Sequence, residues 1–393
     1  KAGEITFYNL DGDEIEKESK EIKWDAQAAE KAGYEHFMMK EIHEQPKAVK
    51  DTFNSVVKDG VIDLSNVGLT KGDIEAISRI HIVACGSAWH VGMVAQYVIE
   101  DLAKIPVRVE LASEFRYRKP LLDKNGLVIL ISQSGETADT LAALREAKNR
   151  QVKTLAIVNV VGSSIAREAD NVFYTLAGPE ISVATTKAYS AQLIAVYTLA
   201  LQFAKERNEI EMSEYEKLIK ELDTLPDKIQ EVIDNQEEIQ KFAAKQAAAK
   251  DVFFIGRGID YAVSLEGSLK LKEISYIHSE AYAAGELKHG TISLIEDGTL
   301  VIGVLTQDEL YEKTISNMVE CKSRGAYLMG LTTYGNYTVE DTAEFTVYVP
   351  KTDAHFMASL AVVPLQMLGY YVSVAKGLDV DKPRNLAKSV TVE

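Results

Sequence analysis

The sequence has 393 residues, 46% of them hydrophobic and 26% charged, which is typical of a globular protein with two or three domains. Its net charge of −16 argues against nucleic-acid binding and requires any phosphate to be bound locally, by hydroxyl and backbone N–H groups. Cys85 and Cys321 cannot form a disulfide framework, and no apolar run of about 18 residues predicts a membrane span, so we expect a cytoplasmic protein.

The chain opens with a strand-like segment at 4–10, followed by a turn signal at 11–13. One strand and a turn cannot bury a core, so this segment is either a β-extension or, as the initial Lys1 favours, the last part of an upstream domain. The polar, alanine-rich region from 25 to 57 predicts a helical linker. We therefore expect residues 1–50 to be a domain remnant plus linker.

The remainder contains an internal repeat of apolar strands, each followed by a helical segment. The predicted strands are 80–86, 126–131, 154–159 and 171–176 in the first copy, and 252–258, 300–305, 327–332 and 344–349 in the second. The predicted helices include 139–150, 188–205, 311–324 and 357–375. Continuous apolar strands that alternate with helices predict a parallel sheet covered on both faces.

The predicted fold class is therefore α/β, with two tandem doubly wound, flavodoxin-like domains. We place them at 51–215 and 216–376, followed by a C-terminal tail at 377–393. The charge-rich stretch 206–246 is expected to be a solvated bridging helix.

Ligands of such sheets bind beyond the carboxyl ends of the strands. The loop after the strand at 126–131 reads Ser-Gln-Ser-Gly-Glu-Thr at 132–137. Three hydroxyls, a glycine and the N–H groups of the next helix favour phosphate binding, whereas a plain helix cap would need only one hydroxyl. The second copy has Thr-Gln-Asp-Glu at 306–309, where two carboxylates would repel phosphate. We therefore predict one phosphate site per chain, in the first domain.

The loop after the strand at 80–86 faces the same crevice. Gly86 and Ser87 could offer backbone and hydroxyl groups to a sugar, while Cys85 is either a nucleophile or a buried small residue. The loop fits neither the G-x-G-x-x-G nor the Walker pattern, which disfavours a nucleotide-dependent Rossmann enzyme.

A candidate acid–base cluster lies in GSLKLKEISYIHSEAYAAGELKHG, residues 267–290. Lys270 and Glu273 share one helix face with Glu266. An exposed ion pair is the plain alternative, but the surrounding apolar and aromatic residues indicate burial, and a buried Lys and Glu indicate a functional site. His289 by itself is weak evidence, because a His before Gly is often a turn residue.

Three long motifs, at 132–137, 270–290 and 381–393, resemble the isomerase half of the glutamine–fructose-6-phosphate aminotransferase family. That half consists of two sugar-isomerase (SIS-type) domains and a short tail, so the resemblance implies the same architecture here. The implied substrate-binding residues are Gly86, Ser87, Ala88, Ser132, Gln133, Ser134, Thr137, Val183, Ala184, Thr185 and Ala387. Many relatives carry a hydroxyl residue at the position of Ala88.

The resemblance also implies four catalytic residues. Glu273 would move a proton between C1 and C2 of the sugar, with Lys270 assisting beside it. His289, reaching in from a second subunit, would open the sugar ring. Lys388 would meet the open-chain carbonyl, as an imine or as a charge that stabilises an oxyanion. The tail would then be an ordered lid, although its lack of periodicity predicts a disordered terminus.

The expected activity is the isomerisation of fructose 6-phosphate and glucose 6-phosphate, without a metal or cofactor, in at least a homodimer. Glucosamine 6-phosphate is a third expected ligand. The family's glutaminase domain, which supplies ammonia, is not contained in this sequence, so no glutamine hydrolysis is expected. The alternative is a non-catalytic sugar-phosphate sensor, which would need the loop at 132–137 but neither Glu273, His289 nor the tail.

Overall fold

The computed structural model describes residues 6–16 and 30–392 of the chain. The expected N-terminal strand is present as β1 (Phe7–Tyr8), which pairs with β2 (Glu14–Ile15) in an antiparallel hairpin across the predicted turn. Residues 4–5 of the predicted strand and 25–29 of the predicted linker lie outside the described residues. The origin of this hairpin, extension or domain remnant, stays a prediction.

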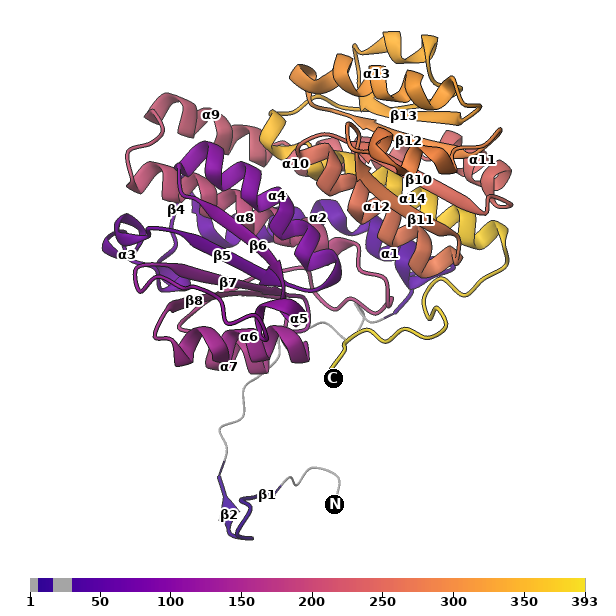
Figure 1. Cartoon of the computed structure of the whole chain (residues 1–393). Coiled ribbons are helices and arrows are strands. Elements are labelled where there is room, and N and C mark those ends of the chain that lie inside the picture. Colours follow the sequence, from indigo (N-terminus) through magenta and orange to yellow (C-terminus); the bar gives the residue numbers. More distant parts are fainter. Residues whose placement is uncertain (1–5, 17–29, 393) are drawn as a thin grey trace.

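Two five-stranded parallel sheets organise the molecule, as the repeated strand pattern predicts (Figure 1). The first sheet contains β5 (Ile80–Ala84), β6 (Val107–Leu111), β7 (Leu127–Ser132), β8 (Lys153–Val158) and β9 (Asn171–Tyr174). The second contains β10 (Asp251–Gly256), β11 (His278–Ala283), β12 (Leu300–Leu305), β13 (Tyr327–Thr333) and β14 (Phe345–Val349). Their orders correspond, β6-β5-β7-β8-β9 and β11-β10-β12-β13-β14. Each sheet therefore has its switch point between its first and third strands in sequence.

The edge strands β6 and β11 were not predicted from the sequence. Both pair with a neighbour on one side only, so part of each strand stays accessible to water. Their sequences, VRVEL and HSEAYA, accordingly mix polar with apolar residues and lack the continuous apolar run of the inner strands.

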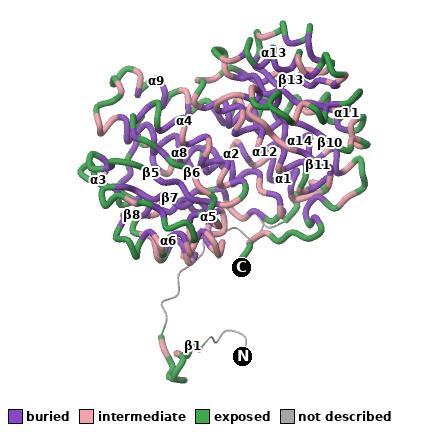
Figure 2. Tube along the Cα trace, in the orientation of Figure 1, coloured by how far each residue is buried: buried purple, intermediate pink, exposed green. Residues whose placement is uncertain are grey.

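Helices cover both faces of each sheet. The long helices are α4 (Gly86–Ala103), α6 (Ala138–Asn149), α8 (Lys187–Glu206), α12 (Ile259–Ser275), α13 (Tyr311–Lys322) and α14 (Ala358–Ala375). Alternate residues of β5 point to opposite faces: Ile82 joins the core that includes α4 and α8, whereas Val83 joins the core under α6. The first of these cores continues through α12 and α14, so the two sheets share a central helical layer that is mostly buried (Figure 2).

The segment 206–246 is not a solvated bridging helix, so that prediction was wrong. It forms α9 (Met212–Asp223), α10 (Leu225–Asp234) and α11 (Glu237–Gln246), and each buries an apolar face. Leu218, Ile229 and Phe242 are examples of these buried residues. Charged residues dominate the composition because they occupy the outer faces, while the apolar positions recur at helical spacing and pack inward.

The predicted helical linker is helical, but it is packed into the core. It contains α1 (Phe37–His43) and α2 (Gln45–Val56), which bury Met38, Ile42, Val49 and Phe53 against α8, α10 and α14. Shorter elements are β3 (Val57–Lys58), β4 (Val61–Ile62), α3 (Lys71–Ala76), α5 (Ala112–Phe115), α7 (Ser164–Glu168) and the 3-10 helices at 65–67, 287–289, 291–294, 308–310, 337–341 and 354–356. The domain boundaries 1–50, 51–215, 216–376 and 377–393 stay predictions.

Among the described residues, one helical segment, Ala354–Ala375, is long and apolar enough to cross a membrane. Within the fold 89% of its most apolar window is buried, as in the core helix of a globular protein. Its apolar character is therefore accounted for by its place in the central helical layer.

Candidate functional site

The loop at 132–137 connects β7 to α6 and turns sharply at Gly135. This glycine has a φ of +65°, and a Cβ there would lie 2.0 Å from the Ser163 Oγ, so the turn requires glycine. The Gly135 N–H donates to the Ser132 Oγ (3.0 Å), which lies 3.1 Å from the Thr137 Oγ1. The Glu136 N–H donates to the Ser134 Oγ (3.2 Å). The hydroxyls thus surround the start of α6, where aligned N–H groups and the helix dipole favour an anion.

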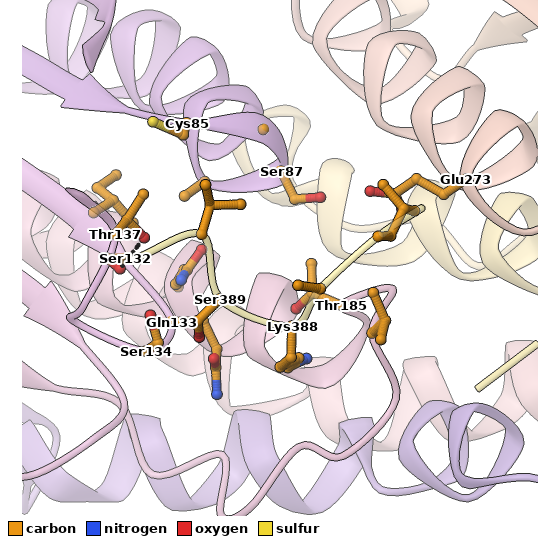
Figure 3. Close-up of a pocket in the computed structure, with 18 of the residues that line it drawn as sticks. Cys85, Ser87, Ser132, Gln133, Ser134, Thr137, Thr185, Glu273, Lys388 and Ser389 are labelled. Atoms are coloured by element: carbon orange, nitrogen blue, oxygen red, sulfur yellow. Dashed lines mark hydrogen bonds between the residues drawn. The ribbon is translucent and has the colours of Figure 1, made fainter. Parts of the chain in front are cut away.

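A cavity of about 290 Å³ opens beside this loop, between the two sheets and the C-terminal tail (Figure 3). It is lined by Cys85, Gly86, Ser87, Ala88, Ile131, Ser132, Gln133, Ser134, Thr137, Val183, Thr185, Gln192, Lys270, Glu273, Leu386, Ala387, Lys388, Ser389 and Val390. All of the predicted site residues are among them except Ala184 and His289. Ala184 is buried in the loop before α8 and does not line the cavity with its neighbours.

Lys270 and Glu273 project from α12 into the cavity. The Lys270 Nζ lies 2.5 Å from the Glu273 Oε2 and 3.5 Å from the Glu266 Oε1. Lys270 and Glu266 have no exposed side-chain surface, whereas Glu273 is 21% exposed. Burial alone lowers the pKa of Lys270, but the charges of Glu273 and Glu266 outweigh it and raise the pKa above its ordinary value. The lysine is therefore held as an ammonium ion.

Glu266 joins this cluster to the first sheet. The Ser87 Oγ donates to its Oε1 (2.9 Å), and the His90 Nδ1 lies 2.7 Å from its Oε2, both from α4. Burial raises the pKa of Glu266, but Lys270 and His90 bring it below its ordinary value. Sequence reasoning missed His90, because no local pattern links it to a residue on α12.

The tail lies over the cavity, as the resemblance implied. The disordered terminus that its lack of periodicity predicted is not what the structure shows. The Lys388 Nζ lies 2.5 Å from the Glu180 Oε2 and donates to the Ser182 carbonyl (2.8 Å). The Ala138 N–H, in the first turn of α6, donates to the Val390 carbonyl (3.0 Å). The tail therefore touches both the loop before α8 and the helix start beside the phosphate loop.

The beginning of the tail is fixed by other elements. The carboxylate of Asp381 accepts from the Phe37 and Met38 N–H groups, at 2.9 Å each, and so caps α1. The Arg384 N–H donates to the Tyr276 Oη (2.8 Å), and its guanidinium stacks on that ring at 4.2 Å. These contacts order a segment that has no helix or strand.

Two candidates stand apart from this cluster. His289 is exposed at the end of the 3-10 helix Leu287–His289 and does not line the cavity, so its entry from a second subunit stays a prediction. Cys85 lines the cavity, but burial raises the pKa of its thiol, which disfavours a nucleophilic thiolate.

The equivalent loop of the second sheet is closed to an anion. Buried Asp260 accepts from the Thr306 N–H (2.8 Å) and the Gln307 N–H (3.2 Å), so an internal carboxylate occupies the donors that a phosphate would need. This geometry supports the expectation of a single phosphate site. Within the described part of the chain, no group of three or more His, Cys, Asp or Glu side chains is arranged to hold a metal ion.

Comparison with known proteins defines the class of this fold and site. A family model described as the SIS domain matches residues 74–202 and 247–376, more than half of the chain. The chain therefore belongs to the SIS-domain family. Its architecture, two tandem α/β units with parallel sheets, is thereby confirmed.

The similar proteins are more specific. The whole chain is 57% identical to a glutamine–fructose-6-phosphate aminotransferase (isomerizing) of Caldanaerobacter subterraneus and covers 65% of it; one from Clostridium tetani is 56% identical, with 99% of this chain and 64% of that protein covered. The C-terminal domain of glucosamine–fructose-6-phosphate aminotransferase from Francisella tularensis has 40% identity and a TM-score of 0.86, covering 90% of this chain and all of that one. The chain thus spans about two thirds of the length of the curated relatives.

Proposed function

We propose that this chain binds fructose 6-phosphate and catalyses its ketose–aldose isomerisation, the sugar half-reaction of glucosamine 6-phosphate synthesis. One observation carries the proposal: a single cavity combines the hydroxyl-rich loop of one sheet with Lys270 and Glu273 of the other and Lys388 of the tail. The hydroxyl-rich loop suits the phosphate at one end of a small sugar, and the lysines and the carboxylate suit proton transfer at its other end.

The phosphate of the sugar would lie against Ser132, Gln133, Ser134 and Thr137. These residues offer hydroxyl, amide and helix N-terminal groups and no acidic side chain, which suits an anion on a protein of net charge −16. Gly86, Ser87, Ala88, Val183, Ala184, Thr185 and Ala387 are the further proposed substrate-binding residues. Ser87 donates to Glu266, so its contribution to the sugar site includes fixing that carboxylate.

Glu273 is the proposed base for the proton transfer between C1 and C2. It is the carboxylate that lines the cavity and is partly accessible, and its Oε2 lies 2.5 Å from the Lys270 ammonium. Lys270 would also stabilise negative charge on the enediol oxygens. Lys388 would meet the carbonyl of the open-chain sugar, and His289 of a second subunit would open the ring.

The assembly follows from the same proposal. The similar aminotransferases are longer than this chain, and a glutaminase domain would supply the ammonia that converts the isomerase reaction into glucosamine 6-phosphate synthesis. We propose a homodimer at least, because His289 lies outside the cavity of its own chain. We also propose a cytoplasmic location, where the sugar phosphates are found, and no glutamine hydrolysis by these residues alone.

The test is conversion of fructose 6-phosphate to glucose 6-phosphate, measured by coupling to a glucose-6-phosphate dehydrogenase. We expect turnover by the wild type and a loss of about 10²–10⁴-fold in Glu273→Gln, because a general base is removed. Glu312→Gln, an exposed carboxylate on α13, is the matched control. Equal rates for wild type and Glu273→Gln would refute the proton-transfer role, and binding without turnover by the wild type would favour the sensor.

A second variant tests the phosphate loop. Ser134→Ala should weaken fructose 6-phosphate binding by about 1–3 kcal/mol, because a hydrogen bond to a charged ligand is lost. An affinity equal to the wild type, measured by calorimetry, would rule out this assignment.

A further inference from the structure

Lys388 is held by a carboxylate that is itself fixed in place. Glu180 has no exposed side-chain surface, and its Oε1 accepts from the Thr186 N–H (2.9 Å) and the Ala188 N–H (3.1 Å) at the start of α8. Its Oε2 accepts from the Thr185 hydroxyl (2.8 Å) and contacts the Lys388 ammonium. One carboxylate oxygen is thus committed to the helix and the other to the tail.

This arrangement makes the lysine a matched partner of a buried charge. Burial alone raises the pKa of Glu180, but the charge of Lys388, its hydrogen bond and the N–H groups of α8 bring it below the ordinary value. An ionised carboxylate without exposed surface is costly to leave without a cation. When the tail closes, the Lys388 ammonium therefore comes to lie beside the Glu180 carboxylate and balances its charge.

A second carboxylate supports the loop from behind. Glu41 of α1 is 1% exposed, and its Oε1 accepts from the Ile181 N–H (2.5 Å) and the Ser182 N–H (3.2 Å), which directly follow Glu180. Its Oε2 has no hydrogen-bond partner among the described residues. Burial and the neighbouring charge of Glu180 raise the pKa of Glu41 to about 8, so at neutral pH the pair carries mainly one negative charge, which Lys388 balances.

The same loop contacts the tail at a second point and contributes to the cavity. The Val183 N–H donates to the Asp381 carbonyl (3.0 Å), and the Asp381 carboxylate caps α1, which also carries Glu41. Val183 and Thr185 line the cavity. Helix α1, the loop 180–186 and the tail therefore form one connected unit, although sequence analysis assigned α1 to a linker.

We propose that Glu180 is the positioning residue for Lys388 and that Glu41 holds the loop that carries it, so that the two carboxylates form a latch that keeps the tail over the cavity. The Glu180 carboxylate cannot follow the tail, because its Oε1 is bound to α8. The ammonium is therefore delivered to one place whenever the tail closes. The role of Lys388 at the sugar carbonyl rests on the proposed function. The contacts by which Glu180 and Glu41 hold the tail do not depend on it.

The first experiment needs no activity. Hydrogen exchange of the tail peptide 381–392 is measured by mass spectrometry on the full chain without ligand. In Glu180→Gln, whose amide oxygen can still accept from α8, we expect exchange about tenfold faster than in the wild type, because the charged partner of Lys388 is lost. Glu41→Gln should give a smaller increase. Glu35→Gln, an exposed neighbour before α1, is the matched control and should give none.

A variant of the tail guards against misfolding of the buried variants. Lys388→Met changes a partly exposed residue and should open the tail to the same extent, whereas Lys382→Met, at an exposed tail position, should not. In the Lys388→Met background, Glu180→Gln should add little, because both act through one contact. Unchanged exchange in Lys388→Met or Glu180→Gln, or fully additive effects, would overturn the latch.

The kinetic experiment tests the positioning role. With fructose 6-phosphate, Glu180→Gln should lower kcat by at least about tenfold while KM changes by less than about threefold, because the phosphate loop is intact and the charged contact that is lost is the one that positions the lysine. An unchanged kcat would overturn the positioning role. Absence of turnover in the wild type would refute the proposed function but leave the exchange experiment as the test of the latch.

Discussion

The buried charge cluster at Glu266 allows the sharpest test of how the two sheets are joined. Its carboxylate contacts Ser87 (2.9 Å), His90 (2.7 Å) and Lys270 (3.5 Å), and none of its side chain is exposed. Glu266→Gln keeps the shape but leaves the Lys270 ammonium buried with Glu273 as its remaining carboxylate partner. Removing one member of a buried ion pair costs about 3–5 kcal/mol, and because Glu273 is retained we expect about 3 kcal/mol.

The measurement is urea unfolding followed by circular dichroism and by tryptophan fluorescence, to which Trp24 and Trp89 contribute; Trp89 precedes His90 on α4. The double variant Glu266→Gln/Lys270→Met removes both fully buried charges and should lie within about 1 kcal/mol of the wild type, because the Glu273 carboxylate that loses Lys270 is 21% exposed and can be hydrated. Glu312→Gln serves as the exposed control. A loss below about 1 kcal/mol in Glu266→Gln, or a double variant less stable than the single one, would refute this reasoning.

Two further predictions concern buried titratable groups. Burial raises the pKa of Asp260 to about 6, from 3.8, so the folded state binds this proton more tightly than the unfolded state does. The free energy of unfolding should therefore fall by about 3 kcal/mol as the pH rises from about 4 to about 6. In denaturant titrations, Asp260→Asn should flatten this part of the pH profile. A profile unchanged from the wild type would contradict the assignment. Burial also raises the pKa of the Cys321 thiol to about 11, so iodoacetamide at pH 8 should label Cys321 only after unfolding. Cys85 should be labelled slowly in the folded protein and more slowly with fructose 6-phosphate present; rapid labelling of both thiols in the native state would show that the environments described are wrong.

Local pattern was sufficient for the inner strands and for one part of the candidate site. Strands such as β7 and β12 are covered on both faces, so their sequences are almost continuously apolar and were predicted. Lys270 and Glu273 were paired correctly in space because helical geometry places residues three apart on one face. The edge strands β6 and β11 were not predicted because polar residues interrupt their apolar runs. The buried faces of the helices in 206–246 were not predicted because the charged outer faces dominate the composition.

The sequence by itself determined the repeated α/β pattern, the hydroxyl-rich loop at 132–137 and the pairing on α12, since each depends on residues close together in the chain. Only the tertiary structure decided which distant groups meet: Glu266 with His90, 176 residues away, and Lys388 with Glu180, 208 residues away. The tail is the clearest case. Its order comes from single contacts to α1, α6 and the loop before α8, and contacts of that kind leave no periodicity in the sequence.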